Sequence, residues 1–249
     1  MVDWSAMLAA TPPRMLAGTL RRLVESQEQV ATSRLVSSLT RQAQLEEMIE
    51  ATKPALRPGT ENLHYLLAAP FRYPPLKHGS RFGRRSEPSL FYGSLETRTV
   101  LAEAAFYRFV FWYDMARPPP EKLDTQHTLF GAQYRTERGL ELQEAPFAQH
   151  EAVLIHRADY RQTQALGSSL RAADIEAFEF ISARDPDHGL NVALASPAAF
   201  ANPRPIFQEV WLAELTGEHV RFKAAHGNEV YDFMVETFQI NGWLPRPSA

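Results

Sequence analysis

The last third of the chain consists largely of short apolar segments of strand length, and this constrains the fold more than any other feature. These segments predict β-strands, and they cover 175–183, 190–196, 207–215, 219–224 and 229–240. Thr216-Gly217-Glu218 predicts a hairpin turn between the third and fourth segments. Because helical patterns do not alternate regularly with these strands, we expect an α+β domain with flanking helices rather than a doubly wound sheet.

The middle of the chain mixes helical and extended patterns. We expect helices over 97–115 and 160–173 and strands over 89–94 and 127–136. Pro118, Pro119 and Pro120 follow the first helix, and Asp159 precedes the second as its cap. Arg138 and Gly139 predict a turn after the second strand.

Residues 14–52 carry apolar side chains at three- and four-residue steps, beginning with Leu16 and Leu20. This spacing predicts one helix, or two helices separated by the polar run SQEQVATS. The segment KPALRPGT at 53–60 is typical of a linker. We therefore expect an N-terminal helical extension over 1–55 and a main domain over 56–249. The extension either packs on the main domain or forms the surface of a homodimer or of a partner complex.

The composition is that of an ordinary globular protein. Of the 249 residues, 45% are hydrophobic and 22% are charged, and the formal net charge is −3. No global positive charge attracts nucleic acid or an anionic membrane, so we expect neither as a partner. The absence of cysteine excludes disulfides and thiolate nucleophiles. With no secretory signal and no apolar run near the roughly 20 residues of a membrane span, we expect a cytoplasmic protein.

The common catalytic signatures are missing. The sequence has no G-x-x-x-x-G-K-[ST] phosphate loop, no G-x-G-x-x-G and no G-x-S-x-G. Its eight histidines form no H-E-x-x-H or H-x-x-x-H pair. We predict no metal centre, and a metal site assembled from distant histidines stays an open alternative.

A cationic loop precedes the strand at 89–94. Arg81, Arg84 and Arg85 lie in SRFGRRSEPSLFY, and guanidinium groups suit phosphate oxygens. A solvated loop is the alternative explanation. Along the strand, Tyr92 and Phe91 point to opposite faces, so one of them enters the core while the other lines a cleft. We expect Tyr92 to line it.

Glu103 is an acid in a helix that is otherwise apolar nearly all round. It shares a stripe with Val100, Tyr107 and Val110. Acids are almost never fully buried unless they are paired, so Glu103 needs a partner or a cleft. A functional carboxylate and a structural ion pair with Arg98 or Arg108 explain this equally well.

The segment FEFISARDPDHGLN ends a strand with a hydroxyl and a guanidinium, from Ser182 and Arg184. These groups suit an anionic, hydroxyl-bearing ligand. A turn stabilised by Ser182 and Asp185 side chains is the alternative.

Together these segments resemble the RES-domain family, which is named for a shared Arg, Glu and Ser. The matching pieces are GSRFG, EPSLFYGS, TVLAEAAF and FISARDPDHGLNVAL, over roughly residues 63 to 240. Residues 1–55 lie outside the resemblance. Phe82 stands where many members have tryptophan, and the loop after Arg81 is about one residue longer.

The resemblance implies a fold like that of ADP-ribosyltransferases and a role as the toxin of a toxin–antitoxin pair, with an antitoxin of the Xre type as partner. It also implies cleavage of the nicotinamide–ribose bond of NAD, with NAD as substrate and water or inorganic phosphate as acceptor. By the same resemblance, Glu103 stabilises the reacting ribose, Arg81 binds pyrophosphate, Tyr92 stacks on nicotinamide, and Ser182 with Arg184 orients the substrate.

Three other functions remain as alternatives. An ADP-ribosyltransferase would use the same site to modify a protein. A non-catalytic interaction protein would dock a partner through its helical arm and release no nicotinamide. A basic toxin that cleaves RNA would leave NAD unchanged.

Overall fold

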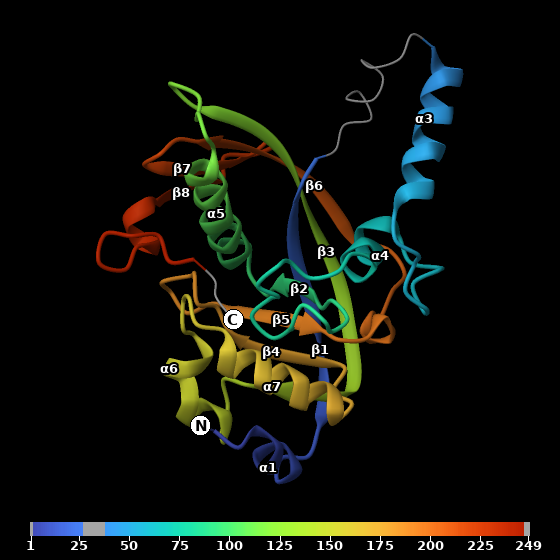
Figure 1. The fold of residues 1–249 in the computed structure, drawn as a ribbon, viewed down its shortest axis with the longest axis vertical. Helices are drawn as coiled ribbons and strands as arrows, with labels where there is room; N and C mark the ends of the chain where they lie inside the picture. The colour runs from blue at the N-terminus through green and yellow to red at the C-terminus, as the bar shows by residue number, and fades with distance from the viewer. Residues whose placement is uncertain (1, 27–37, 247–249) are drawn as a thin grey trace.

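The computed structural model describes residues 2–26 and 38–246. At its centre is one sheet in the order β1-β2-β5-β4-β3-β6-β7-β8, as Figure 1 shows. The strands are β1 (Arg14–Glu25), β2 (Phe91–Ser94), β3 (Leu123–Glu141), β4 (Ala177–Ile181), β5 (Leu190–Leu194), β6 (Phe207–Leu215), β7 (His219–Ala224) and β8 (Val230–Met234). All pairings are antiparallel except that of β3 with β4, so the sheet is mixed.

β3 organises the sheet because it pairs along both edges. One edge pairs with β1, from Arg14 opposite Gly139 to Glu25 opposite His127. The other edge pairs with β6 and, at its end, with β4. Because β1 also meets β2, the strands β1, β2, β5, β4 and β3 close into a ring.

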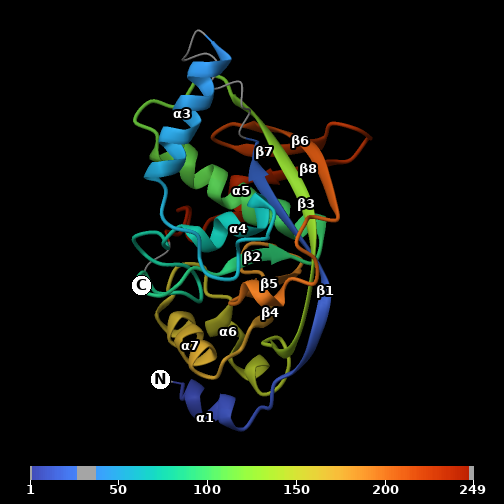
Figure 2. The same ribbon diagram turned by 90° about the vertical axis from the view of Figure 1, so that its right-hand side faces the viewer.

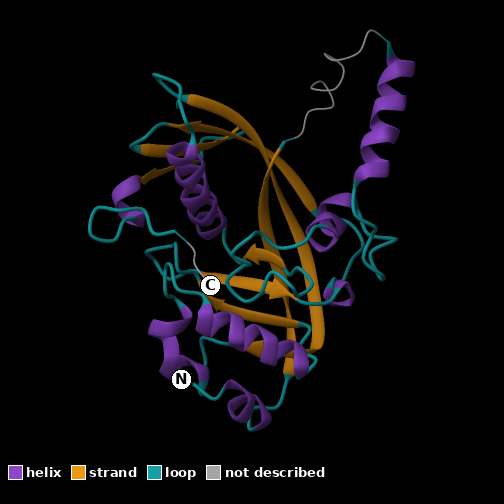
Figure 3. Cartoon of the chain, viewed as in Figure 1, coloured by secondary structure: helices purple, strands orange, loops and turns teal. Residues whose placement is uncertain are grey.

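The helices lie around this sheet, as the purple ribbons of Figure 3 show. They are α1 (Trp4–Ala9), α3 (Leu39–Thr52), α4 (Tyr65–Arg72), α5 (Thr97–Asp114), α6 (Glu151–Leu154) and α7 (Arg161–Ala172). α5 packs its apolar side chains into one hydrophobic cluster, together with residues of β6, β7 and β8. α1 and α7 pack together over a second cluster that includes Phe178 and Phe180 of β4. No helix in the described part of the chain is long and apolar enough to cross a membrane.

The architecture confirms the expected α+β class. α5 fills the predicted range 97–115 and ends before the three prolines. β6 and β7 have the predicted bounds, and Thr216-Gly217-Glu218 joins them as a turn. α7 begins at Arg161 with Tyr160 as its N-cap, so the expected cap position of Asp159 is wrong by one residue, although the Asp159 carboxylate still accepts a hydrogen bond from the Arg161 amide at 3.0 Å.

The predicted helix over 14–52 is wrong for its first part and correct for its last. Residues 14–25 form β1, whereas 39–52 form α3 and 27–37 lie outside the described residues. The error has a simple cause, because a four-residue step keeps two side chains on one face of a strand as well as of a helix. Leu16 and Leu20 are indeed both buried on β1. The domain boundary near residue 55 stays a prediction.

Two smaller expectations also need correction. Arg138 and Gly139 do not form a turn but continue β3. Gly139 is needed for close approach, because a Cβ atom there would lie 2.3 Å from Cβ of Leu16 on β1. In addition, the strand expected over 229–240 ends at Met234 and is followed by a 3₁₀ helix over Val235–Phe238.

α3 differs from the other helices because none of its residues is buried. Figures 1 and 2 both show it standing apart from the sheet. An ion pair between Glu50 and Arg72 connects its C-terminal end to α4.

The buried histidine of β3 makes the stability of the fold depend on pH. His127 is 3% exposed, and its ring bonds to Thr125 Oγ1 at 2.9 Å. Burial, with help from the Arg108 cation, lowers the pKa of His127 to about 4. Since the folded-state pKa lies below the unfolded value, this neutral imidazole stabilises the fold fully above pH ~6.5, and the contribution is lost as pH falls toward 4.

We expect the free energy of unfolding to fall by up to roughly 3 kcal/mol between pH 7 and pH 4 from this group. Urea unfolding at several pH values measures it, and His127→Gln should flatten the acid limb. His226→Gln, at an exposed position, is the matched control. An acid limb that is the same in wild type and His127→Gln would rule this explanation out.

Candidate functional site

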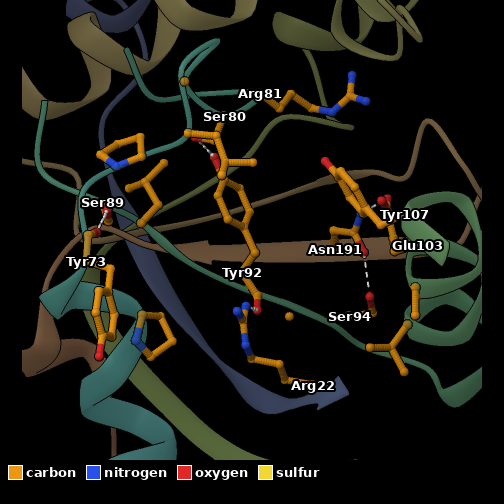
Figure 4. Close-up of a pocket in the computed structure, with 18 of the residues that line it drawn as sticks. Arg22, Tyr73, Ser80, Arg81, Ser89, Tyr92, Ser94, Glu103, Tyr107 and Asn191 are labelled. Carbon is orange, nitrogen blue, oxygen red and sulfur yellow. Dashed lines mark hydrogen bonds between the residues drawn. The ribbon is translucent and has the colours of Figure 1, made fainter. Parts of the chain in front are cut away.

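One large cavity, of about 440 Å³, opens between α5, the loop before β2, and the strands β1, β2 and β5. Figure 4 shows its lining side chains, with Tyr92 in the middle. Glu103, Asn191 and Tyr107 lie on one side of it, and Arg22 lies near the main chain of Tyr92. Tyr73 lies on the opposite side, and the lining also includes the apolar residues Pro70, Pro74, Pro75 and Leu76. The cavity therefore combines charged groups with an apolar wall, as small-molecule sites do.

Glu103 projects from α5 into this cavity and is half-buried. Its Oε1 accepts a hydrogen bond from Ser182 Oγ at 2.6 Å and another from Asn191 Nδ2 at 2.7 Å. Neither bond uses Oε2, which has no hydrogen bond within residues 2–26 and 38–246. The carboxylate is thus held by one oxygen and leaves the other available to a ligand.

The structural ion pairs considered for Glu103 are not formed. Arg98 pairs with Asp187, and Arg108 pairs with Glu25 at 2.8 Å. Glu103 is therefore held by neutral donors, and no cation among the described residues forms an ion pair with its charge.

Ser182 lies behind Glu103 and is not part of the cavity lining. It is 2% exposed, follows β4, and accepts hydrogen bonds from the main-chain amides of Arg184 and Asp185 at 3.1 and 3.0 Å. The Ser182 hydroxyl itself donates a hydrogen bond to Glu103 Oε1. Ser182 therefore affects the cavity by orienting the Glu103 carboxylate.

Asn191 was not singled out from the sequence, although it lines the cavity. It lies on β5 directly opposite Ser94 of β2, and Ser94 Oγ donates to its Oδ1 at 2.6 Å. This bond fixes the amide so that Nδ2 faces Glu103. The available signal was a polar residue inside the apolar strand LNVAL, where a core side chain is expected.

Arg81 lines the cavity and is 8% exposed. Its Nη1 donates to the main-chain oxygens of Leu154 and His156 at 3.1 and 3.0 Å, and its guanidinium lies 4.9 Å from the centre of the Tyr160 ring. No carboxylate in the described part of the chain forms an ion pair with it. Arg84 and Arg85, by contrast, are exposed.

Of the two adjacent aromatics on β2, Tyr92 lines the cavity and Phe91 is fully buried in a hydrophobic cluster. The Tyr92 hydroxyl bonds to Ser80 Oγ at 2.9 Å and accepts the Phe82 amide at 3.2 Å. Burial raises the pKa of the Tyr92 phenol, so it stays neutral at physiological pH. These bonds fasten the loop that carries Arg81 to β2.

Arg184 is 1% exposed and does not line the cavity. Its Nη2 donates to the Arg157 main-chain oxygen at 2.6 Å and to Tyr160 Oη at 3.2 Å, and its guanidinium lies 3.5 Å from the centre of the Phe106 ring. Burial lowers its pKa. Arg184 therefore supports the ring of Tyr160, against which Arg81 lies.

The five residues singled out from the sequence thus fall into two layers. Arg81, Tyr92 and Glu103 line the cavity, whereas Ser182 and Arg184 lie behind it. Among the described residues, no group of three or more histidine, aspartate and glutamate side chains is arranged to hold a metal ion.

Comparison with known proteins gives a family and similar solved structures. A family model described as the RES domain matches residues 55–223. No curated protein matches the sequence. The MbcT–MbcA toxin–antitoxin complex of M. tuberculosis contains a chain that is 9% identical, with a TM-score of 0.47, over 86% of this chain and 92% of that chain.

Proposed function

The chain belongs to the RES-domain family, since the family model covers residues 55–223, and we propose that it cleaves the nicotinamide–ribose bond of NAD. The observation that carries this proposal is the Glu103 carboxylate, which is fixed by two neutral donors through Oε1 and faces a cavity that Arg81 and Tyr92 also line. The cavity thus holds a fixed carboxylate, from Glu103, and a guanidinium with no ion-pair partner among the described residues, from Arg81. These groups suit a substrate that develops positive charge during the reaction and also carries phosphate.

The chemistry of the bond explains why these few groups suffice. Nicotinamide leaves as a neutral molecule, so no strong acid has to protonate it. The ribose develops oxocarbenium-like positive charge, as in glycoside cleavage. In our proposal Glu103 Oε2 stabilises that charge and binds a ribose hydroxyl. Because Ser182 and Asn191 already orient the carboxylate, little reorganisation is needed in the transition state.

The other residues take supporting roles in this proposal. Arg81 binds the pyrophosphate, and Tyr92 stacks on nicotinamide. Ser182 is a positioning residue that acts through Glu103 rather than on the substrate, and Arg184 positions Arg81 through Tyr160. We further propose that an antitoxin neutralises the activity, because the RES family is known for the toxins of toxin–antitoxin pairs.

Product analysis tests the proposal and identifies the acceptor. Purified protein is incubated with NAD, with and without inorganic phosphate, and the products are identified by mass spectrometry. Free ADP-ribose indicates water as acceptor, ADP-ribose 1″-phosphate indicates phosphate, and ADP-ribosylated protein indicates a transferase. Every one of these reactions releases nicotinamide. If none is released at any enzyme concentration, the proposed function is wrong.

A further inference from the structure

The cavity has an apolar end that the proposed mechanism does not use. Tyr73 lines the cavity on the side of Tyr92 that is opposite to Glu103, as Figure 4 shows. The same stretch of chain, residues 70–76, supplies four more lining residues, which are Pro70, Pro74, Pro75 and Leu76. We call residues 70–76 the proline segment. None of its residues that line the cavity is charged, so this end does not suit a phosphate or a carboxylate.

The main chain of the proline segment is fixed by hydrogen bonds. The Ser89 hydroxyl donates to the main-chain oxygen of Tyr73. Farther along, the amide of Gly79 donates to the main-chain oxygen of Leu76 at 2.8 Å. The proline rings also lock the φ angle at three of the seven positions. The segment therefore presents its side chains to the cavity in a set direction before any ligand binds, which lowers the entropy cost of binding.

The two aromatic side chains of the proline segment differ in their surroundings. Phe71 is buried, and its ring centre lies 6.1 Å from that of Phe91 and 6.3 Å from that of Phe200. Tyr73 is 44% exposed, and within residues 2–26 and 38–246 its ring stacks on no aromatic side chain and its hydroxyl makes no hydrogen bond. Leu76, which also lines the cavity, is exposed as well. Phe71 therefore serves the core, whereas Tyr73 keeps an open ring face.

A flat heterocyclic ring suits this end of the cavity. Aromatic side chains stack on nucleic-acid bases because every base has a π face, and an offset or edge-on approach needs only an open ring. The proline rings and Leu76 offer apolar surface to the rest of such a ligand. The apolar end therefore matches an uncharged, planar base rather than the sugar or the phosphates of a nucleotide.

We propose that the Tyr73 ring stacks on the adenine base of the dinucleotide, and that the proline segment forms this base subsite. The identity of the ligand rests on the proposed function, which puts the reacting ribose at Glu103, on the other side of Tyr92. NAD carries its two ring systems at opposite ends of a pyrophosphate, so adenine lies far from the bond that breaks. Tyr73 is thus a specificity residue that selects a dinucleotide, and it does not touch the reacting atoms.

Binding measurements on the full chain test the base subsite without turnover. AMP and ribose 5-phosphate share a sugar and a phosphate, but only AMP carries the base, and each is titrated by calorimetry. Wild type should bind AMP more tightly than ribose 5-phosphate. Tyr73→Ala should weaken AMP binding by about 5- to 100-fold and leave ribose 5-phosphate unchanged, whereas Tyr73→Phe keeps the ring and should bind as wild type does. Tyr65→Ala, at an exposed position on α4 outside the lining, is the matched control.

The difference between the two probes decides the outcome. If wild type binds AMP no more tightly than ribose 5-phosphate, or Tyr73→Ala keeps the full advantage of AMP, the base subsite is wrong. Equal weakening of both probes in Tyr73→Ala would make Tyr73 a structural residue and would also contradict the proposal. If Tyr73→Ala does not fold, the same comparison with Tyr73→Leu decides, because leucine keeps apolar bulk but has no aromatic ring.

Nicotinamide release by the same preparations separates the two proposals. Because stacking on adenine is the same in the ground state and in the transition state, Tyr73→Ala should raise the KM for NAD and change kcat little. Release by wild type together with AMP binding that does not depend on Tyr73 contradicts the base subsite alone. Absence of release together with Tyr73-dependent binding of AMP contradicts the proposed function and supports the base subsite.

Discussion

Glu103→Gln is expected to lower the kcat for NAD cleavage by about 100- to 1,000-fold, with little change in the free energy of unfolding. Glutamine has nearly the same shape as glutamate, and its amide oxygen can still accept the hydrogen bonds of Ser182 and Asn191. What it lacks is the negative charge on the atom that faces the cavity. The loss should therefore fall on the transition state, and the fold should persist.

Steady-state kinetics and urea unfolding of the same preparations separate these effects. Glu137→Gln is the matched control, because Glu137 is exposed on β3 and the substitution removes the same charge. Near-normal kcat in Glu103→Gln would remove Glu103 from the mechanism. A loss of activity that merely follows a loss of folded protein would make Glu103 a structural residue.

Asn191→Asp is expected to lower kcat/KM at pH 7 by about 10- to 100-fold, through a different mechanism. The substitution replaces the amide that donates to Glu103 Oε1 with a second carboxylate. Two carboxylates at hydrogen-bond distance cannot both ionise easily, so they share a proton with a strongly raised apparent pKa. The shared proton weakens the negative charge that Glu103 presents to the ribose.

This mechanism predicts a particular pH dependence. Activity of Asn191→Asp should recover as pH rises, because the pair loses its proton above its raised pKa and Glu103 regains full charge. The pH profile of kcat/KM tests this, with Asn228→Asp at an exposed position as the control for added charge. A loss of activity that does not change with pH would contradict the positioning role of Asn191.

Local sequence patterns were sufficient to predict the elements that are set by residues close together in the sequence. The three prolines after α5 stop a helix wherever they occur, and Thr216-Gly217-Glu218 joins two strands that are neighbours in sequence. Glu103 could be found because a charge in an apolar helix is improbable without a partner. The presence of that partner was predictable, but its identity was not.

The rest of the site depends on contacts between distant segments. Asn191 acquires its role because β5 pairs with β2, which brings Ser94 opposite it, and because α5 packs nearby with Glu103. Arg22 was hidden within a segment expected to be helical, where its side chain could not be assigned to any cavity. The alternating pattern of β1 and the four-residue step of a helix agree at Leu16 and Leu20, so the sequence alone does not separate them.

The release of nicotinamide from NAD tests the central claim most directly. Free nicotinamide is followed over time by chromatography after wild-type protein, Glu103→Gln or Glu137→Gln is added to excess NAD at pH 7. We predict many turnovers by wild type and by Glu137→Gln, and almost none by Glu103→Gln. Wild-type protein that is folded but leaves NAD intact, with or without added phosphate, would contradict the account.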